Sequence, residues 1–366
     1  MKVQRVRLPE TSHISWLVLD DDYVPIEPIL HYLQFLDTLE RSPYTIRSTA
    51  YHLKLFWEFL RDRHLEWKKI DVSSLASFIT WLRQRDSSAL SIDPQKAKRT
   101  NATIDQILTA VHGYYDFHVR LHTVPELPLY QFLIRPTRHY KPFLHGIAKN
   151  KPLQRRIVST KREQRHVKTL TTDQVQKLLN ACTHTRDLFL LKLLYDTGMR
   201  IGQALGLRHE DLNIEDGEIE IVPRNDNSNG ARAKTRFSYT IPVLPDLMQL
   251  YTDYLVEDLG ALEVPSLPDY VFVNLWEGKI GRPMTYETVR SLVRRLCKKT
   301  DIQFSPHMLR HTCATEWIRG KKVSLEEASR LLGHASIETT HNTYVHLTKE
   351  DLKKALEDAK GNDDGQ

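Results

Sequence analysis

Cysteine is scarce in this sequence of 366 residues, which has only Cys182, Cys297 and Cys313. An odd and widely spaced set argues against a disulfide framework and favours a reducing compartment. Long apolar runs are also missing. No segment approaches the roughly 18 apolar residues of a membrane-spanning helix, and residues 1–10 lack the apolar run of a signal peptide. We therefore expect a cytoplasmic protein that does not span a membrane.

The composition places the chain among globular proteins that favour acidic partners. Apolar residues make up 40% of the sequence, enough to build hydrophobic cores. The net charge is +6 and the pI is about 9.0, so nucleic acid is the first partner to consider. At roughly 150 residues per domain, the length predicts two domains.

The N-terminal part reads as a short extension followed by an all-α domain. Residues 1–27 are mixed in character and carry no chemistry that we can assign. Within residues 28–126, apolar side chains recur at steps of three and four, which predicts helices near Ile29 and over 44–62, 72–84 and 101–119. Arg47 and Lys54, on the second of these helices, are candidate DNA-binding residues.

Residues 127–170 are strongly basic. They contain 11 Lys or Arg and one acid, Glu163, and four prolines interrupt them. This composition predicts an extended basic linker between two domains, with a merely solvated connector as the alternative. The residues that we expect to contact DNA phosphates here are Lys149, Lys151, Arg155 and Arg156.

A second domain is predicted over 171–347, followed by a tail at 348–366. Thr171 and Gln174 have the spacing of a capping box. A strongly apolar helix over 187–196 is closed by Gly198. Two strands, 218–223 and 236–243, surround a polar loop. Further helices are predicted over 247–259, 285–299, 308–319 and 325–332, and a tail helix over 348–359.

Three segments of this second domain carry the chemistry. The first runs Thr197-Gly-Met-Arg-Ile201, the second Pro306-His-Met-Leu-Arg-His-Thr312, and the third begins Leu331-Leu-Gly-His334 and reaches Tyr344 ten residues later. Each of these residues alone would be an ordinary surface or core residue. The ordered set resembles the tyrosine recombinase (phage integrase) family, which has a T-G-x-R-I box, an H-x-x-R box, an L-L-G-H box and a following tyrosine.

The resemblance covers about residues 28–347 and implies a fold and an activity. The implied fold is mainly α with a small β-sheet: a two-domain DNA clamp with an all-α core-binding (SAM-like) domain and a mixed α/β catalytic domain. The implied partner is double-stranded DNA, cut and rejoined in a tetramer without metal, ATP or another cofactor. Within the family, the chain is most similar to the transposase A group of Gram-positive site-specific transposons, so other transposon-encoded proteins are possible partners.

The resemblance also assigns roles to residues. Arg200 and Arg310 would hold the phosphate oxygens through charge-assisted hydrogen bonds. His307 would help to move the tyrosine's proton and contact the phosphate, and His334 would donate a hydrogen bond to it. Tyr344 would be the nucleophile. Lys234 would protonate the departing 5′ oxygen, although Arg232 and Arg236 are close in sequence.

The chain departs from the family pattern at two points. Gln203 stands where an acid is usual, and the spacing from His334 to Tyr344 is ten where nine is common. The histidines could suggest zinc, but Arg310 beside a dication would be repelled, and His311 is interpreted as structural. The functional alternatives are a phage integrase, a Xer-like resolvase with the same chemistry, and a catalytically silent DNA-binding protein.

Overall fold

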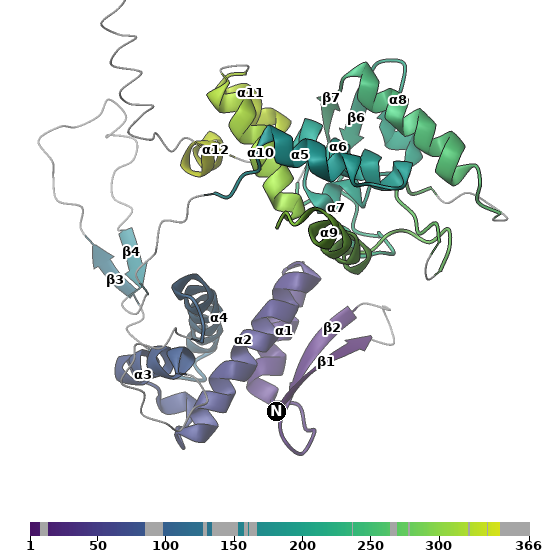
Figure 1. The fold of residues 1–366 in the computed structure, drawn as a ribbon. Helices are drawn as coiled ribbons and strands as arrows, with labels where there is room; N and C mark the ends of the chain where they lie inside the picture. The colour runs from purple at the N-terminus through teal and green to yellow at the C-terminus, as the bar shows by residue number, and fades with distance from the viewer. Residues whose placement is uncertain are drawn as a thin grey trace, which may run out of the picture. The chain divides into compact units, whose positions relative to one another are not determined.

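The computed structural model describes residues 1–7, 14–84, 98–126, 130–133, 153–156, 160, 167–235, 237–263, 269–276, 279–320, 323–334 and 336–344. The chain divides into two compact units, Met1–Gln164 and Arg165–Gln366, coloured purple to blue and teal to yellow in Figure 1. Among the described residues, each unit has a large hydrophobic core. No helix in the described part of the chain is long and apolar enough to cross a membrane.

The first unit is built on four helices: α1 (Glu27–Thr38), α2 (Pro43–Asp62), α3 (Val72–Arg83) and α4 (Asn101–Arg120). The apolar periodicity of the sequence predicted all four. Polar N-cap residues mark the starts of α3 and α4, since the side chains of Asp71 and Thr100 accept hydrogen bonds from backbone amides of the first turn. A short 3₁₀ turn, Trp67–Lys69, joins α2 to α3. The helices enclose an aromatic core that includes Phe56, Phe78, Tyr114 and Tyr115.

The N-terminal extension is a β-hairpin, which the sequence pattern did not predict. Strand β1 (Lys2–Arg7) pairs antiparallel with β2 (Ile14–Leu19), with Arg5 opposite Trp16. Val18 is buried in the core of the first unit, and the hairpin contacts α1 and α2 (Figure 1). The extension is therefore part of this unit's folded body.

The basic connector also contains structure that its composition did not indicate. Strands β3 (Tyr130–Leu133) and β4 (Leu153–Arg156) pair antiparallel. Further along, the backbone amide and hydroxyl of Thr160 donate hydrogen bonds to Asp105 on α4, at 3.0 and 2.7 Å. This part of the connector is therefore fastened to the first unit.

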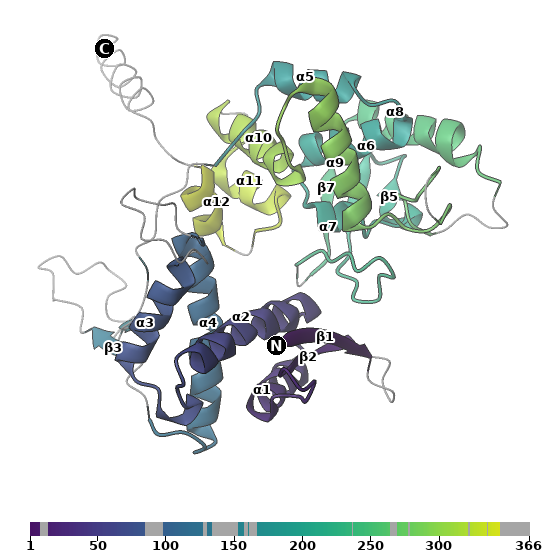
Figure 2. The ribbon, with the colours of Figure 1, turned by 60° about the horizontal axis from the view of Figure 1, so that its bottom comes forward.

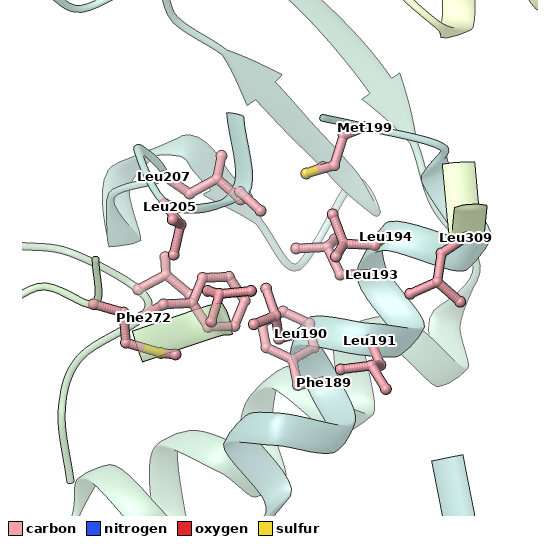
Figure 3. Packing of buried hydrophobic residues seen from close by; sticks show 14 of the residues in the cluster. Phe189, Leu190, Leu191, Leu193, Leu194, Met199, Leu205, Leu207, Phe272 and Leu309 are labelled. Atoms are coloured by element: carbon pink, nitrogen blue, oxygen red, sulfur yellow. The ribbon is translucent and has the colours of Figure 1, made fainter. Parts of the chain in front are cut away.

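The second unit is organised around α6 (Thr185–Thr197), which Gly198 ends as predicted. Its leucines and Phe189 pack against Met199, Leu205, Leu207 and Phe272 (Figure 3). Helix α5 (Thr172–Asn180) precedes it and begins with the predicted capping box, in which Thr171 and Gln174 exchange side-chain to backbone hydrogen bonds. A short helix, α7 (Ile201–Ala204), follows directly after Arg200.

A small antiparallel sheet follows, in the order β5 (Leu212–Asn213), β6 (Glu218–Ile221) and β7 (Tyr239–Pro242). The last two are the predicted strands, and the polar loop between them contains Lys234. Helix α8 (Pro245–Tyr254) continues into a π-helical turn, Leu255–Leu259. Helix α9 (Tyr286–Thr300) is capped by Thr285.

Three helices complete the described part of this unit: α10 (Pro306–Arg319), α11 (Leu325–Leu331) and α12 (Ile337–Tyr344). They pack against one another (Figure 2). Between His334 and Tyr344, the residues from Ile337 onward form α12, with Tyr344 as its last residue. The predicted tail helix over 348–359 lies outside the described residues.

Candidate active site

The guanidinium group of Arg310 is the point at which the three sequence motifs meet. It donates from Nη1 to the Gly198 carbonyl at 2.6 Å, and from Nη2 to the Leu332 carbonyl at 2.9 Å and to His334 Nε2 at 2.8 Å. Arg310 is buried, and burial together with the nearby Arg200 lowers its pKa to about 10. The guanidinium group of Arg310 therefore remains charged at neutral pH and holds the three motif segments together.

The contact with Arg310 determines the tautomer of His334. Because a guanidinium group can only donate, Nε2 must accept, and the ring proton must be on Nδ1. Nδ1 then donates to Thr340 Oγ1 at 2.7 Å, across to α12. Burial, with the charges of Arg310 and Arg200, lowers the pKa of His334 to about 4. His334 is therefore neutral at pH 7, and Thr340 orients its ring.

Arg200 lies at the start of α7 and its side chain is half-buried. Gln203 holds its backbone, since Gln203 Oε1 accepts the Arg200 amide hydrogen at 2.7 Å, and Gln203 Nε2 donates to the Tyr239 hydroxyl at 2.9 Å. A neutral amide thus orients this part of the site where the family usually has an acid. Arg200 Nη1 is buried without a hydrogen-bond partner among the described residues. A buried cationic donor without a hydrogen-bond partner is well placed to bind an anion.

Tyr344 is 5% exposed, and its ring packs against Ala314 and Leu332. Its hydroxyl lies 3.0 Å from Nδ1 of His311. Burial raises the pKa of Tyr344, while the positive charge of Arg310 and a hydrogen bond from it oppose the rise. The phenol of Tyr344 is therefore buried in the candidate active site of its own chain. It lies beside Arg310, whose charge stabilises the ionised form of the phenol.

His307 and Lys234 are the more exposed members of the predicted set. Burial is the main cause that lowers the pKa of His307, and the charges of Arg310, Arg200 and Lys234 add to it. These charges act on His307 because they are close to it. The six predicted catalytic residues are thus close enough to interact: Arg200 and Arg310 act electrostatically on His307, His334 and Tyr344, and Lys234 acts on His307.

The loop that carries Lys234 approaches the arginine box closely at Gly202. A Cβ atom there would lie 2.5 Å from the Arg232 carbonyl oxygen and 2.5 Å from the Tyr286 hydroxyl. Arg232 is tied down, because its Nη2 donates to Asn225 at 2.6 Å. Lys234 has a left-handed backbone with φ of 55° and an exposed side chain, whereas Arg236 lies outside the described residues.

Gly333 permits a similar close approach beside His334. Its φ is +60°, and a Cβ atom would lie 2.5 Å from the Tyr239 hydroxyl. We expect Gly333→Ala to destabilise the fold by more than the ~1 kcal/mol cost of a left-handed alanine, and to abolish most strand cleavage by displacing Tyr239 and His334. Urea unfolding and cleavage assays measure the two effects.

Gly217→Ala is the matched control for that substitution. Gly217 has a similar φ of +64°, but the nearest atom to its Cβ would be the Val243 carbonyl oxygen at 3.2 Å, in the turn between β5 and β6. It should lose stability and keep its cleavage rate. Equal cleavage by the two variants would contradict the role that we give to the contact between Gly333 and Tyr239.

The predicted DNA-binding residues are not part of this cluster. Arg47 is exposed on α2, with its guanidinium group 5.2 Å from the Trp16 ring centre and 5.8 Å from that of Tyr51. Lys54 forms an ion pair with Glu58 at 2.9 Å, which makes it the weaker candidate. The predicted DNA-binding residues Arg155 and Arg156 belong to β4 by their backbones, and their side chains lie outside the described part of the structure. The remaining two, Lys149 and Lys151, lie outside it entirely.

Sequence reasoning missed three residues that touch the predicted set: His311, Thr340 and Tyr239. The adjacency of His311 to Arg310 was the only available signal for the first. Nothing in the sequence pattern marked Thr340 or Tyr239, because their contacts depend on how α12 and β7 dock on the rest of the unit. Gln203 was noticed only as a departure from the family pattern.

Comparison with known proteins agrees with this fold and shows the family. Residues 168–351 match the model of the phage integrase family, and residues 29–122 match that of the phage integrase N-terminal SAM-like domain. The chain is 39% identical to transposase A from transposon Tn554 of Staphylococcus aureus, over 96% of each chain. It is 25% identical to the tyrosine recombinase XerA of Thermococcus kodakarensis, over 92% of this chain and 96% of that one.

Solved structures show the same fold. The Tn1549 transposon integrase, in complex with a circular intermediate DNA, superposes with a TM-score of 0.62 at 16% identity, over 90% of this chain and 98% of that chain. A lambda integrase dimer bound to a COC′ core site gives 0.57 at 16% identity, over 87% and 94%.

Fold, motifs and relatives together define a site-specific DNA recombinase, an enzyme that cuts and rejoins DNA strands. The chain belongs to the phage integrase family, whose members are the tyrosine recombinases.

Proposed function

We propose that this recombinase breaks DNA by attack of Tyr344 on a phosphodiester, forming a 3′-phosphotyrosyl intermediate and releasing a 5′ hydroxyl. The observation that carries this proposal is the cluster at Arg310, whose hydrogen bonds join Gly198, Leu332 and His334 around the buried phenol of Tyr344. Because the phosphotyrosyl bond keeps the energy of the broken bond, a second strand can reseal it without ATP.

The cations of the site have separate tasks in this proposal. Arg200, whose Nη1 has no hydrogen-bond partner in the described part of the chain, and Arg310 bind the non-bridging oxygens, where negative charge collects in the transition state. His307 and His334 contact the same phosphate. The tautomer that we infer for His334 directs its unprotonated Nε2 at Arg310. We therefore expect a phosphate to turn some of the Arg310 hydrogen bonds toward itself as it binds. Lys234 protonates the leaving 5′ oxygen.

We further propose that the reaction serves transposition: excision and integration of the element that encodes the chain. The 39% identity with a Tn554 transposase over nearly the whole chain supports this assignment. The substrate is double-stranded DNA in the cytoplasm, and the reaction proceeds in a synaptic tetramer, with other transposon-encoded proteins as partners. A second candidate is a Xer-like resolvase, supported by the likeness to XerA.

A strand-cleavage assay on a suicide substrate, a duplex nicked beside the cleavage site so that the short product escapes, tests the chemistry. We expect a covalent protein–DNA adduct that survives denaturation. A catalytically silent DNA-binding protein would give a mobility shift and no adduct. Footprinting on the ends of the encoding element, followed by an excision assay, separates a transposase, which releases a circle from those ends, from a resolvase, which needs two copies of one site.

The basic connector gives a separate prediction about affinity. Phosphate contacts release counterions, with a slope of about −0.9 per contact in a plot of log K against log salt. Replacing Lys149, Lys151, Arg155 and Arg156 with Gln should make that slope shallower by about 2–4 units. Base preference should barely change, since phosphate contacts carry no sequence information directly. A variant that kept its salt slope but lost its site preference would show that the connector reads bases instead.

A further inference from the structure

His311 contacts the reacting atom of the proposed nucleophile, although from the sequence we interpreted it as structural. Its Nδ1 lies 3.0 Å from the Tyr344 hydroxyl, and the two ring centres are 5.6 Å apart. No hydrogen bond of His307, one turn earlier on α10, reaches Tyr344 among the described residues, and the ring centres of His307 and His311 are 6.2 Å apart. Of these two histidines, His311 is therefore the one in contact with the phenol.

The direction of this hydrogen bond follows from the other groups around the phenol. Arg310 can only donate, and its positive charge acts on the Tyr344 oxygen and favours the ionised phenol. The phenol's own hydrogen then needs an acceptor, and His311 Nδ1 is the one within reach among the described residues. This arrangement requires a neutral His311 with its ring proton on Nε2.

From this geometry we infer that His311 is a catalytic residue, the general base that takes the proton of Tyr344 as the phenol attacks DNA. The inference rests on the proposed role of Tyr344 as nucleophile. The proton moves from the Tyr344 oxygen to His311 Nδ1 while the oxygen forms its bond to phosphorus. The bond from phosphorus to the 5′ oxygen breaks, and that oxygen takes a proton from Lys234. Resealing reverses each transfer.

The surrounding charges make this base sensitive to the substrate. The groups that face His311 are His307 and Arg310 on α10, Tyr344 on α12 and His334 before α12. Burial lowers the pKa of His311 to about 4, and His307 and Arg310 contribute. A bound phosphate offsets the charge of Arg310, which raises the basicity of His311. The proton thus stays on Tyr344 until DNA occupies the site.

Two substitutions separate proton transfer from simple positioning. His311→Ala removes the ring, while His311→Asn offers an amide oxygen that can accept the phenol's hydrogen bond but cannot take its proton. Both should bind DNA normally and cleave a suicide substrate about 100-fold or more slowly, the usual contribution of a general base. His307→Asn, on the same helix, is the matched control. Added bases should not restore its cleavage rate.

Added bases then test the role directly. Imidazoles of graded pKa should restore adduct formation by His311→Ala, with a rate that rises with the pKa of the base. A substrate with sulfur at the bridging 5′ position should leave His311→Ala slow, because a better leaving group does not replace a base at the nucleophile.

Three results would overturn the inference: near-normal cleavage by His311→Asn, rescue that is independent of the pKa of the added base, or rescue by the 5′ sulfur. The first two indicate that the ring only positions Tyr344, and the third indicates an action on the leaving group. Absence of an adduct with the unsubstituted protein would instead refute the proposed function, so the two failures are distinguishable.

Discussion

Tyr344→Phe should bind its DNA site with unchanged affinity and form no covalent adduct. The phenyl ring keeps the packing against Ala314 and Leu332, so the loss to the fold is confined to the polar contacts of the hydroxyl with His311 and Arg310, each worth about 1 kcal/mol. The phenol oxygen, however, is the proposed attacking atom, and nothing replaces it. Suicide-substrate cleavage followed by denaturing electrophoresis measures adduct formation, and a mobility-shift assay measures binding.

Tyr286→Phe is the control for that experiment. Tyr286 is the first residue of α9, and its hydroxyl lies close to Gly202 in the arginine box. It is thus another tyrosine near the site that the proposal leaves without a chemical role, and its variant should still form the adduct. An adduct that persisted in Tyr344→Phe and disappeared in Tyr286→Phe would transfer the nucleophile to α9.

Lys234→Ala should slow cleavage by about 10²–10⁴-fold, because an alkoxide leaves poorly without a proton. A substrate with sulfur in place of the bridging 5′ oxygen should restore most of the rate, since a thiolate leaves without one. Single-turnover cleavage of the two substrates measures this difference. The exposed side chain of Lys234 and its electrostatic effect on His307 support the assignment.

The neighbouring arginines serve as comparisons for Lys234. Arg232 donates to Asn225, so Arg232→Ala should disturb the loop and show no specific response to the sulfur substrate. Arg236→Ala is the sharper comparison, because Arg236 also lies close to Lys234 in sequence. Sulfur rescue of Arg236→Ala, with none for Lys234→Ala, would mean that the acid is misassigned.

Much of the fold was predictable because its signals are local. Apolar side chains at steps of three and four predicted α1 to α4, and the capping box at Thr171 predicted the start of α5. The hairpin β1–β2 was missed because its strands are stabilised by packing against α1 and α2 rather than by a strong alternating pattern. Helix α12 was missed because its short sequence is mostly polar.

The active site, like the fold, could be predicted only in part from the sequence. The ordered motifs predicted that Arg200, Arg310 and His334 come together, and the structure places them within hydrogen-bonding or electrostatic reach of one another. The partners that orient them could not be predicted. Thr340 reaches His334, and Gln203 reaches Tyr239, only because separate elements dock there. Motif spacing gives the chemistry, whereas tertiary packing decides which neighbours orient it.

Mapping the DNA-linked peptide shows whether Tyr344 forms the covalent bond to DNA. The adduct from a suicide substrate would be digested with protease and nuclease, and the modified peptide sequenced by mass spectrometry. We expect a nucleotide joined through its 3′ phosphate to Tyr344, with a free 5′ hydroxyl on the released strand. A modified residue other than Tyr344, or a linkage through a 5′ phosphate, would contradict this expectation.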